Sequence, residues 1–303
     1  EVAQQLDEGK YNWIGTDKEV DITNPQALEN FAKSVETAAY YPSSLSHADR
    51  QIKWIINCSA YTNVEKAEED VELAEKLNSL GPLNIARLAR KIGAKLIHIS
   101  TDYVFNGQAT TPYTEDMTKN GLGVYGKTKA LGEDAIEKEM VQYYIIRTAW
   151  LYGFDGHNFV YTMTNAMNNH DTVSVVNDQF GTPTCAVDLA NTIITILTKN
   201  ENAKELIGKN SPPPYGIYHF TDEGQTNWFE FAQYIYKYGK KYKHIQNNCT
   251  VNSCTTKEYG AKVQRPAYSV LSKAKITETL KIKIPGWKKS LKNFCKDSRF
   301  NIK

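Results

Sequence analysis

Short apolar segments alternate with amphipathic helical patterns through the first half of this chain, and this alternation restricts the fold more than any other feature. Apolar runs at 53–58, 95–100 and 142–147 are separated by helical patterns at 65–77, 82–92 and 125–138. We expect the strand at 142–147 to continue to Tyr152. Such alternation is typical of a parallel sheet covered by helices on both faces. The sequence therefore predicts an α/β fold with a doubly wound parallel sheet.

The remaining segments extend this arrangement toward both ends. We expect a strand at 12–17, a helix from Asn24-Pro25 to about residue 35, and a surface loop at 39–51. After Gly153 the pattern becomes mixed, with a helix at 159–167, a strand at 172–176 and a helix at 187–198. We predict a Rossmann-like nucleotide-cofactor-binding domain at 1–152, to which 186–220 returns, and a smaller interleaved α/β substrate domain at 153–185 and 221–303.

A hydroxyl at a strand end is followed by a tyrosine and a lysine one helical turn apart. The run Lys95 to Ser100 leads into Thr101, and Tyr125 and Lys129 have i, i+4 spacing, which places them on one helix face. A tyrosine donates a proton to an alkoxide well only if its pKa, ordinarily about 10, falls by roughly three units. A neighbouring ammonium lowers that pKa. The arrangement predicts carbonyl reduction by a nucleotide cofactor, with Thr101 holding the substrate oxygen.

Two further motif matches receive a structural interpretation. Tyr236 and Lys240 repeat the Tyr-x-x-x-Lys spacing, but they lie in a basic aromatic helix end with no hydroxyl-bearing strand before it, and we interpret them as solvated surface. Gly121-Leu-Gly123-Val-Tyr-Gly126 matches the dinucleotide fingerprint literally. No strand precedes it, so we interpret it as the turn that enters the helix of Tyr125.

A doubly wound sheet ordinarily begins with a strand and a glycine-rich turn whose amides hold the cofactor diphosphate. The sequence shows no such turn before Glu1, and residues 1–6 look like the tail of the helix that follows one. We therefore expect the given sequence to begin inside a longer protein.

The composition excludes several classes of protein. A formal net charge of +2 in 303 residues gives no basic footprint for nucleic acid. No apolar run approaches the roughly 20 residues that a membrane span needs. Five widely spaced cysteines without a Cys-x-x-Cys pair argue against a disulfide framework or a zinc site. We expect a soluble cytoplasmic protein that binds neither nucleic acid nor membrane.

Six motifs occur in order along nearly the whole chain. They are Asn57-Cys-Ser-Ala-Tyr-Thr62 with Val64-Glu-Lys-Ala-Glu68, Ser100 to Phe105, Tyr125 to Lys129, Arg147-Thr-Ala-Trp-Leu-Tyr152, Asn177-Asp-Gln-Phe-Gly-Thr-Pro183, and Arg265-Pro266 with Ser269 and Leu271. With these motifs the chain resembles the dTDP-4-dehydrorhamnose reductases, a family of extended short-chain dehydrogenases/reductases. The longer loop at 39–51, and Gly121-Leu-Gly123 in place of a proline-containing approach to the tyrosine, depart from the family pattern.

The resemblance implies hydride transfer from NADPH or NADH to C4 of a dTDP-linked 4-keto-6-deoxy sugar. Tyr125 would protonate the forming alkoxide, Thr101 would hydrogen-bond the keto oxygen, and Lys129 would bind the nicotinamide ribose and lower the tyrosine pKa. Tyr125 would contact the cofactor as well, and further cofactor contacts would come from Asp17, Asp21, Ile22, Ser59, Ala60 and Tyr61. A carboxylate at Asp17 favours NADH, whereas Lys18 beside it would tolerate a 2′-phosphate.

The same resemblance implies a set of residues for the nucleotide-sugar: Asp102, Tyr103, Trp150, Asn158, Gln179 and Arg265. Trp150 would wall the sugar or pack in the core, and Tyr103 is open to the same two interpretations. Arg265 would pair with a diphosphate or form a surface ion pair. Asp102 would join proton transfer or cap the following turn. A homodimer is compatible with the resemblance, and Mg²⁺ occurs at a subunit contact in some relatives, but no carboxylate cluster here demands a metal.

Two other functions remain open from the residues. A nucleotide-sugar dehydratase or epimerase shares the fold and the Tyr-x-x-x-Lys spacing, but dehydratases have Asp-Glu after the strand-end threonine, where this chain has Asp102-Tyr103. A non-catalytic regulatory subunit similar to the beta subunit of methionine adenosyltransferase would keep the fold as a partner-binding module. Thr101, Tyr125 and Lys129 together favour an enzyme.

Overall fold

A four-stranded parallel sheet forms the centre of the molecule. The computed structural model describes residues 1–37, 50–203, 211–261 and 263–301, so most of the loop expected at 39–51 lies outside the described residues. The strands lie in the order β1-β2-β3-β8. Their bounds are β1 Trp54–Asn57, β2 Lys95–Thr101, β3 Tyr143–Thr148 and β8 Gly216–His219. The predicted doubly wound α/β fold is confirmed.

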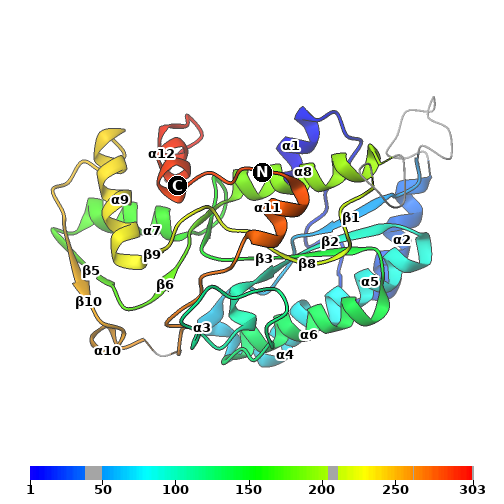
Figure 1. Ribbon diagram of the computed structural model, residues 1–303, viewed down its shortest axis with the longest axis horizontal. Helices are drawn as coiled ribbons and strands as arrows, with labels where there is room; N and C mark the ends of the chain where they lie inside the picture. The colour runs from blue at the N-terminus through cyan, green and yellow to red at the C-terminus, as the bar shows by residue number, and fades with distance from the viewer. Residues whose placement is uncertain (38–49, 204–210, 262, 302–303) are drawn as a thin grey trace.

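Helices cover both faces of this sheet (Figure 1). One face packs against α1 (Val2–Glu8), α8 (Ala186–Glu201) and α11 (Ala274–Leu280), and the other against α2 (Pro25–Glu36), α5 (Gly81–Ile92) and α6 (Val124–Glu139). The apolar residues of β2 and β3 alternate between these two layers: Ile97 and Ile146 join the first core, and Leu96 and Ile145 join the second. Burial on both faces explains the continuous apolar runs in the sequence.

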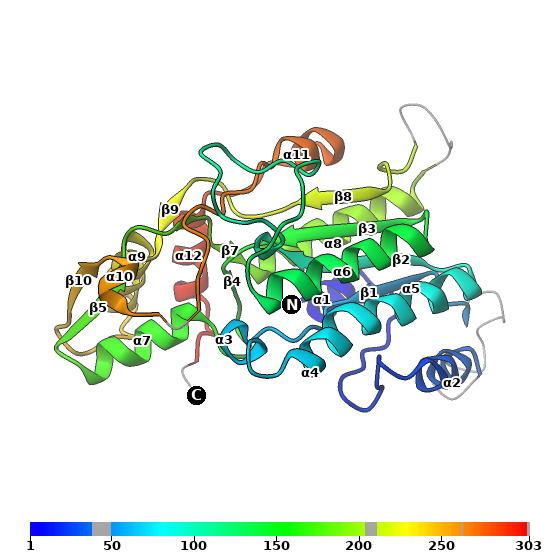
Figure 2. The same ribbon diagram turned by 90° about the horizontal axis from the view of Figure 1, so that it is seen from below.

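The carboxyl ends of the parallel strands place polar side chains along one edge. Asn57 pairs in register with His98, Thr101 with Thr148, and Arg147 with His219. All six side chains are buried. Figure 2 shows this edge facing the second part of the molecule. Ligands of open α/β sheets bind at this end of the strands, so the fold itself selects where the site lies.

The second part of the molecule has its own aromatic core. Its helices are α7 (Phe159–Asn169), α9 (Trp228–Lys241) and α12 (Trp287–Lys296), which pack around Phe231, Trp287 and Phe294. The strands β5 (Thr172–Val176) and β10 (Thr250–Cys254) pair in parallel beside them. The remaining short elements are β4 (Leu151–Tyr152), β6 (Phe180–Gly181), β7 (Thr184–Cys185), β9 (Thr226–Asn227), α3 (Val64–Ala67), α4 (Val71–Glu75), η2 (Lys76–Leu80), η3 (Asp102–Val104) and α10 (Thr256–Tyr259).

Three local predictions were wrong. Residues 12–17 form no strand, because strand geometry needs a hydrogen-bonded neighbour and none of the described strands pairs with them. The helix expected at 65–77 is divided into α3, α4 and the start of η2, because Asp70 has a non-helical backbone (φ −119°, ψ 51°). The strand expected to continue to Tyr152 is interrupted at Trp150, which has φ 49°.

None of the helices among the described residues has both the length and the apolar character required to cross a bilayer.

Candidate active site

Thr101 lies at the carboxyl end of β2 and organises the turn that follows. Its side chain is 5% exposed, and Oγ1 donates to Asp102 Oδ1 at 3.0 Å. The same oxygen accepts from the backbone N of Tyr103 at 3.2 Å, which begins the short helix η3. These two hydrogen bonds hold the Thr101 hydroxyl oxygen at a fixed position at the end of β2.

Tyr125 lies in the first turn of α6, and two contacts set the position of that turn. Glu68 Oε1 accepts from the Val124 backbone N at 2.7 Å, which satisfies a free N–H group at the helix start. A Cβ on Gly126 would lie 2.2 Å from the Tyr103 carbonyl oxygen, so only glycine allows this close approach. The Tyr103 and Tyr125 rings meet edge to face at 5.4 Å. The helix entry predicted at 121–126 is confirmed.

The pKa of Tyr125 shifts in the direction opposite to the prediction. Burial is the largest cause, and with the Asp102 charge it raises the pKa of Tyr125 to about 12, against a hydrogen bond with the Thr101 side chain that lowers it. Lys129, which was expected to lower this pKa, is not among the causes of the shift. Its Nζ donates to the Ile99 carbonyl oxygen at 2.7 Å and lies 3.3 Å from His98 Nε2.

Lys129 is itself buried, with 1% of its surface exposed. Burial lowers its pKa to about 8, although the charges of Glu133 and Cys58 act to raise it. A lysine whose pKa is close to neutral changes between amine and ammonium near physiological pH, in contrast to a surface lysine.

Asp102, which follows β2 at the same edge of the sheet, is a second acid with a raised pKa. It is 2% exposed, and burial raises its pKa to about 6, while hydrogen bonds from Ser269 and Thr101 oppose the shift. Its second carboxyl oxygen, Oδ2, is buried, and no hydrogen bond of normal geometry reaches it. A buried carboxyl group with spare acceptor capacity beside Thr101 is a candidate ligand for a substrate hydroxyl.

The loop after β1 contains Ser59, Ala60 and Tyr61. Asn57 Oδ1 accepts from the Ser59 backbone N at 3.0 Å. Asn78, which is fully buried, accepts from Tyr61 N at 2.8 Å and donates to the Tyr61 carbonyl at 3.1 Å. Asn78 Nδ2 also lies 3.2 Å from Thr128 Oγ1, so this loop is tied to α6. A ligand lying along the loop would therefore reach Lys129 on the same rigid unit.

Of the remaining predicted cofactor residues, Ile22 lies beside α5, and Asp17 and Asp21 lie in the exposed segment before it. Asp17 is exposed in a turn where its backbone N donates to Glu19 Oε1, so the argument that it ends a strand no longer holds. Asp21 is exposed and accepts from the backbone and side chain of Thr23. Asn84 Nδ2 donates to the Ile22 carbonyl at 3.1 Å, which fixes this segment to α5.

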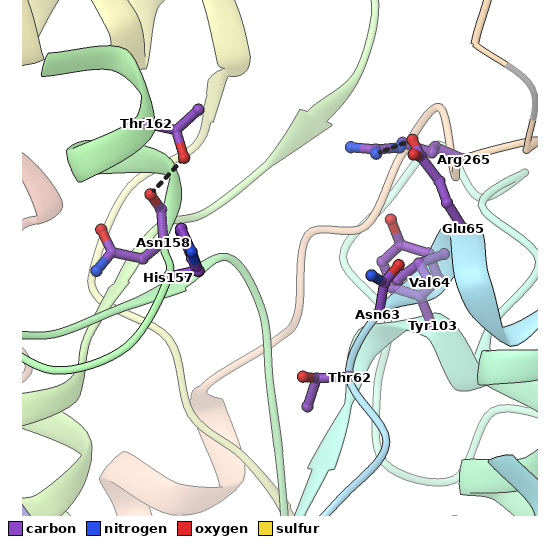
Figure 3. Close-up of a pocket in the computed structure, with 9 residues that line it drawn as sticks. All are labelled: Thr62, Asn63, Val64, Glu65, Tyr103, His157, Asn158, Thr162 and Arg265. Atoms are coloured by element: carbon purple, nitrogen blue, oxygen red, sulfur yellow. Dashed lines mark hydrogen bonds and ion pairs between the residues drawn. The ribbon is translucent and has the colours of Figure 1, made fainter. Parts of the chain in front are cut away.

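A cleft of ≈ 440 Å³ lies between the start of α7 and the segments that follow β1 and β2 (Figure 3). It brings together three of the predicted substrate residues, Tyr103, Asn158 and Arg265. Arg265 Nη2 forms an ion pair with Glu65 Oε1 at 2.9 Å on one wall. Asn158 lies on the opposite wall, where its Oδ1 accepts from Tyr161 N and begins α7.

Comparison with known proteins assigns this arrangement to a family. Residues 1–300 match the family model described as RmlD substrate binding domain. The chain is 35% identical over 289 residues to a dTDP-4-dehydrorhamnose reductase of Aggregatibacter actinomycetemcomitans, covering 95% of this chain and 91% of that protein. A solved dTDP-4-dehydrorhamnose reductase from Clostridium acetobutylicum is 37% identical with a TM-score of 0.82, over 97% of this chain and 92% of that one.

The chain belongs to the dTDP-4-dehydrorhamnose reductase family. The Bacillus anthracis dTDP-4-dehydrorhamnose reductase, solved in complex with NADP, is 32% identical with a TM-score of 0.81, over 97% of this chain and 94% of that one. The predicted family, fold class and enzyme class are therefore confirmed.

Three of the residues expected to contact substrate, Asp102, Trp150 and Gln179, are not part of the cleft lining in this family member. Trp150 stacks on Trp228 with 3.7 Å between ring centroids, and a Cβ on Gly181 would lie 2.6 Å from the Trp150 ring. Gln179 is 4% exposed, and its Nε2 donates to Thr256 Oγ1 at 3.0 Å. Trp150 is partly exposed and packs against the aromatic core, so its position is compatible with both predicted roles.

Sequence reasoning missed the buried residues that support α6 in this family member. Asn57, Asn78 and His98 are buried polar residues, and only their pairing across strands and helices gives them a role. Glu68 ends the motif at 64–68, and the motif by itself gives it no function. The available signal was the presence of a polar residue in an apolar run, as with His98 in the segment 95–100.

No group of three His, Cys, Asp or Glu side chains in the described part of the chain is arranged to hold a metal ion.

Proposed function

We propose that this protein reduces the C4 keto group of dTDP-4-dehydro-L-rhamnose with NADPH or NADH, giving dTDP-L-rhamnose, and that Tyr125 donates the proton. The observation that supports this most directly is the hydrogen bond between Tyr125 and the Thr101 side chain at the end of β2, with Lys129 one helical turn further along α6. The two hydroxyls converge where one substrate oxygen can meet both.

The raised pKa suits the proposed direction of proton transfer. With a pKa of about 12, Tyr125 is a protonated phenol at neutral pH and is ready to donate. An alkoxide is a far stronger base than a phenolate, so transfer to it remains favourable. To hold the acceptor oxygen, Thr101 would turn its hydroxyl proton from Asp102 Oδ1, which accepts it at 3.0 Å in the structure, toward the substrate oxygen.

The residues around Lys129 fit a nicotinamide nucleotide. Ser59 is exposed at the carboxyl end of β1, and Asn78 ties the Ser59–Tyr61 loop to α6 beside Lys129. We propose that Ser59, Ala60, Tyr61 and Lys129 hold the cofactor, with Asp17, Asp21 and Ile22 toward its adenosine end. The reduced cofactor supplies the hydride, and the chain contributes orientation and the proton.

Arg265 and Asn158 are proposed to bind the nucleotide diphosphate of the substrate from opposite walls of the cleft. A guanidinium pairs with phosphate through two N–H groups. In the structure Glu65 occupies one of these positions, and the exposed ion pair is weak enough to exchange for a phosphate. Tyr103, Asp102 and Trp150 are proposed to contact the sugar, and Gln179 to support this wall. We further propose that the protein forms a homodimer.

The test is the rate of NADPH oxidation with dTDP-4-dehydro-L-rhamnose. Tyr125→Phe removes only the phenolic oxygen and should lower kcat about 10²- to 10⁴-fold. NADPH binding, measured by fluorescence titration, should stay within about twofold of wild type. Tyr236→Phe, in the second Tyr-x-x-x-Lys pair on α9, is the matched control and should keep full activity.

Turnover that survives Tyr125→Phe would contradict the proposed proton donor. Elimination of water from a nucleotide sugar, in place of ketone reduction, would support the dehydratase alternative. Absence of any turnover by the wild-type protein, together with tight binding to another enzyme, would support the regulatory-subunit alternative.

A further inference from the structure

Trp150, between β3 and β4, has a backbone conformation that large side chains rarely adopt. Its φ of 49° lies in the left-handed region, where a bulky L residue is strained. Hydrogen bonds from one residue hold the chain here: Thr184 N donates to the Trp150 carbonyl at 3.3 Å, and Thr184 Oγ1 donates to the Ala149 carbonyl at 2.7 Å. A residue in such a conformation persists only where its surroundings hold it, and these positions gather at functional sites.

The indole of Trp150 is held from the second part of the molecule. Trp228, the first residue of α9, stacks on it with 3.7 Å between ring centroids and 14° between ring planes. Trp228 in turn packs against Phe159 and Phe231, at 4.5 Å and 6.3 Å between centroids, so it is anchored in the aromatic core. Because Trp150 follows β3 of the central sheet, the stack joins the two parts at the edge where the strands end.

Gly181 and Ser269 lie at the edge of the same indole. A Cβ on Gly181 would be 2.6 Å from the Trp150 ring and 2.9 Å from Ser269 Oγ, so the ring edge and this hydroxyl meet at one backbone position. Ser269 also interacts with the Asp102 carboxyl group, whose pKa it acts to lower. Asp102 in turn accepts from Thr101, the hydroxyl proposed to hold the substrate oxygen. The Trp150 indole therefore lies next to groups that the substrate sugar would meet.

We propose that Trp228 is a positioning residue, whose stacked ring holds the Trp150 indole beside Asp102 in the orientation that the substrate sugar meets. This inference rests on the proposed function, in which Trp150 contacts the sugar. Immobilising a side chain when a ligand binds is unfavourable, so an indole that is already held costs the substrate less than a free one. Without the stacked ring, the strained backbone of Trp150 would relax and its indole would take up other rotamers.

Trp287 shows how a tryptophan packs when it belongs to the core of the second part alone. It is also the first residue of a helix, α12, but it is 3% exposed, and its ring contacts Phe231 and Tyr234. Trp228 is only partly buried, and it extends from this core to Trp150. The two tryptophans are therefore matched in size and helix position, and Trp228 is the one that stacks on Trp150.

The stack can be detected without substrate or cofactor. Two indoles this close couple their electronic transitions, so the wild-type protein should show an exciton couplet in its far-ultraviolet circular dichroism. Trp150→Phe and Trp228→Phe should each remove the couplet, whereas Trp54→Phe, at a tryptophan that stacks on Tyr144, should keep it. A wild-type spectrum without a couplet, or a couplet that survives Trp228→Phe, would overturn the inference.

Two substitutions at position 228 separate the stacked ring from mere bulk. Trp228→Leu has no ring, and it should raise KM for dTDP-4-dehydro-L-rhamnose about three- to tenfold with kcat unchanged, because the proton donor is not disturbed. Trp228→Phe keeps a ring and should restore KM to within about twofold of wild type. In fluorotryptophan-labelled protein, the ¹⁹F signal of Trp150, assigned by its loss in Trp150→Phe, should move further toward that of free tryptophan in Trp228→Leu than in Trp228→Phe.

Trp287→Leu is the matched control, since it removes a ring of the same size from the same core, and it should lower the melting temperature while leaving KM unchanged. Equal increases of KM in Trp228→Leu and Trp287→Leu would overturn the inference, as would equal increases in Trp228→Leu and Trp228→Phe. If Trp228→Leu does not fold, Trp228→Met gives the same comparison with more of the volume kept. If the couplet and the ¹⁹F signals are as expected but the wild-type protein does not oxidise NADPH, the proposed function fails and the positioning of Trp150 by Trp228 stands.

Discussion

Glu133→Gln should destabilise the protein more than any other single loss of charge on α6. Glu133 is fully buried and accepts from Arg147 Nε at 2.9 Å and Nη2 at 2.7 Å, and from Ser100 Oγ at 2.5 Å. The pair joins α6 to the ends of β2 and β3, next to the turn that contains Tyr125. Glutamine keeps the volume of the side chain, so the variant removes the charge without creating a cavity.

The magnitude follows from what remains around Arg147. The guanidinium is 1% exposed, and without Glu133 its direct contacts are neutral groups: the Glu115 carbonyl oxygen at 3.4 Å, His219 Nε2 at 3.3 Å and the Phe105 ring at 5.0 Å. The Glu115 side chain still interacts with Arg147 electrostatically, but without a direct ion pair. Leaving one member of a buried ion pair uncompensated costs about 3–5 kcal/mol. We expect Glu133→Gln to lower the free energy of unfolding by this amount.

The assay is urea unfolding monitored by circular dichroism, with the midpoint compared at constant slope. Glu139→Gln is the matched control on the same helix, because Glu139 pairs with Arg87 and Arg90, whose side chains are 56% and 62% exposed. Such exposed pairs contribute about 0–1 kcal/mol. The double variant Glu133→Gln/Arg147→Met removes the unpaired charge and should lose less stability than the sum of its two single variants.

A loss below about 1 kcal/mol in Glu133→Gln would refute the reasoning, because it would mean that the guanidinium finds solvent or another anion. Equal losses in Glu133→Gln and the control Glu139→Gln would refute it as well. Additive single variants would show that the two groups do not interact.

Three further predictions concern the same edge of the sheet. Burial raises the pKa of Asp102 from 3.8 to about 6, so the folded state holds an extra proton, and stability should fall by about 3 kcal/mol as pH rises through this window. In Asp102→Asn the urea midpoint should vary less with pH between pH 4 and 6 than in the wild-type protein. The same pH dependence in both proteins would contradict the raised pKa of Asp102. Gly181→Ala should displace the Trp150 ring and cost about 1–3 kcal/mol, seen as lower tryptophan fluorescence polarisation and a lower melting temperature; an unaltered spectrum and stability would contradict the close contact. Glu68→Ala should cost about 1 kcal/mol by freeing the Val124 N–H, and Glu68→Gln less than half of that, because glutamine still accepts the hydrogen bond; equal losses would show that the charge matters more than the bond.

Hydrophobic periodicity was sufficient for the regular elements with two buried faces or one strong apolar stripe. The strand predicted at 95–100 and the helices predicted at 82–92 and 125–138 match β2, α5 and α6 within two residues at each end. Periodicity reports which side chains a segment buries, and this is a local property. The expected strand at 12–17 failed because a strand also needs a partner, and partners are not encoded within the segment itself.

The sequence also predicted where the proposed chemistry lies. An i, i+4 spacing on a helix places Tyr125 and Lys129 on one face, and Thr101 lies at a strand end. The periodicity of helix and strand was therefore enough to predict these three residues as one site. The buried partners His98 and Asn57 were not foreseen, because a single polar residue in an apolar run does not reveal what it faces.

What this sequence determines by itself is the alternation of strands and helices, and with it the edge of the sheet where polar side chains gather. Only the tertiary structure decides the ionisation of those side chains. Tyr125 was expected to have a lowered pKa from its spacing to Lys129, yet the structure gives a raised one. The reason is physical: spacing along a helix sets which residues are neighbours, whereas burial and the direction of each hydrogen bond set which charge state is stable.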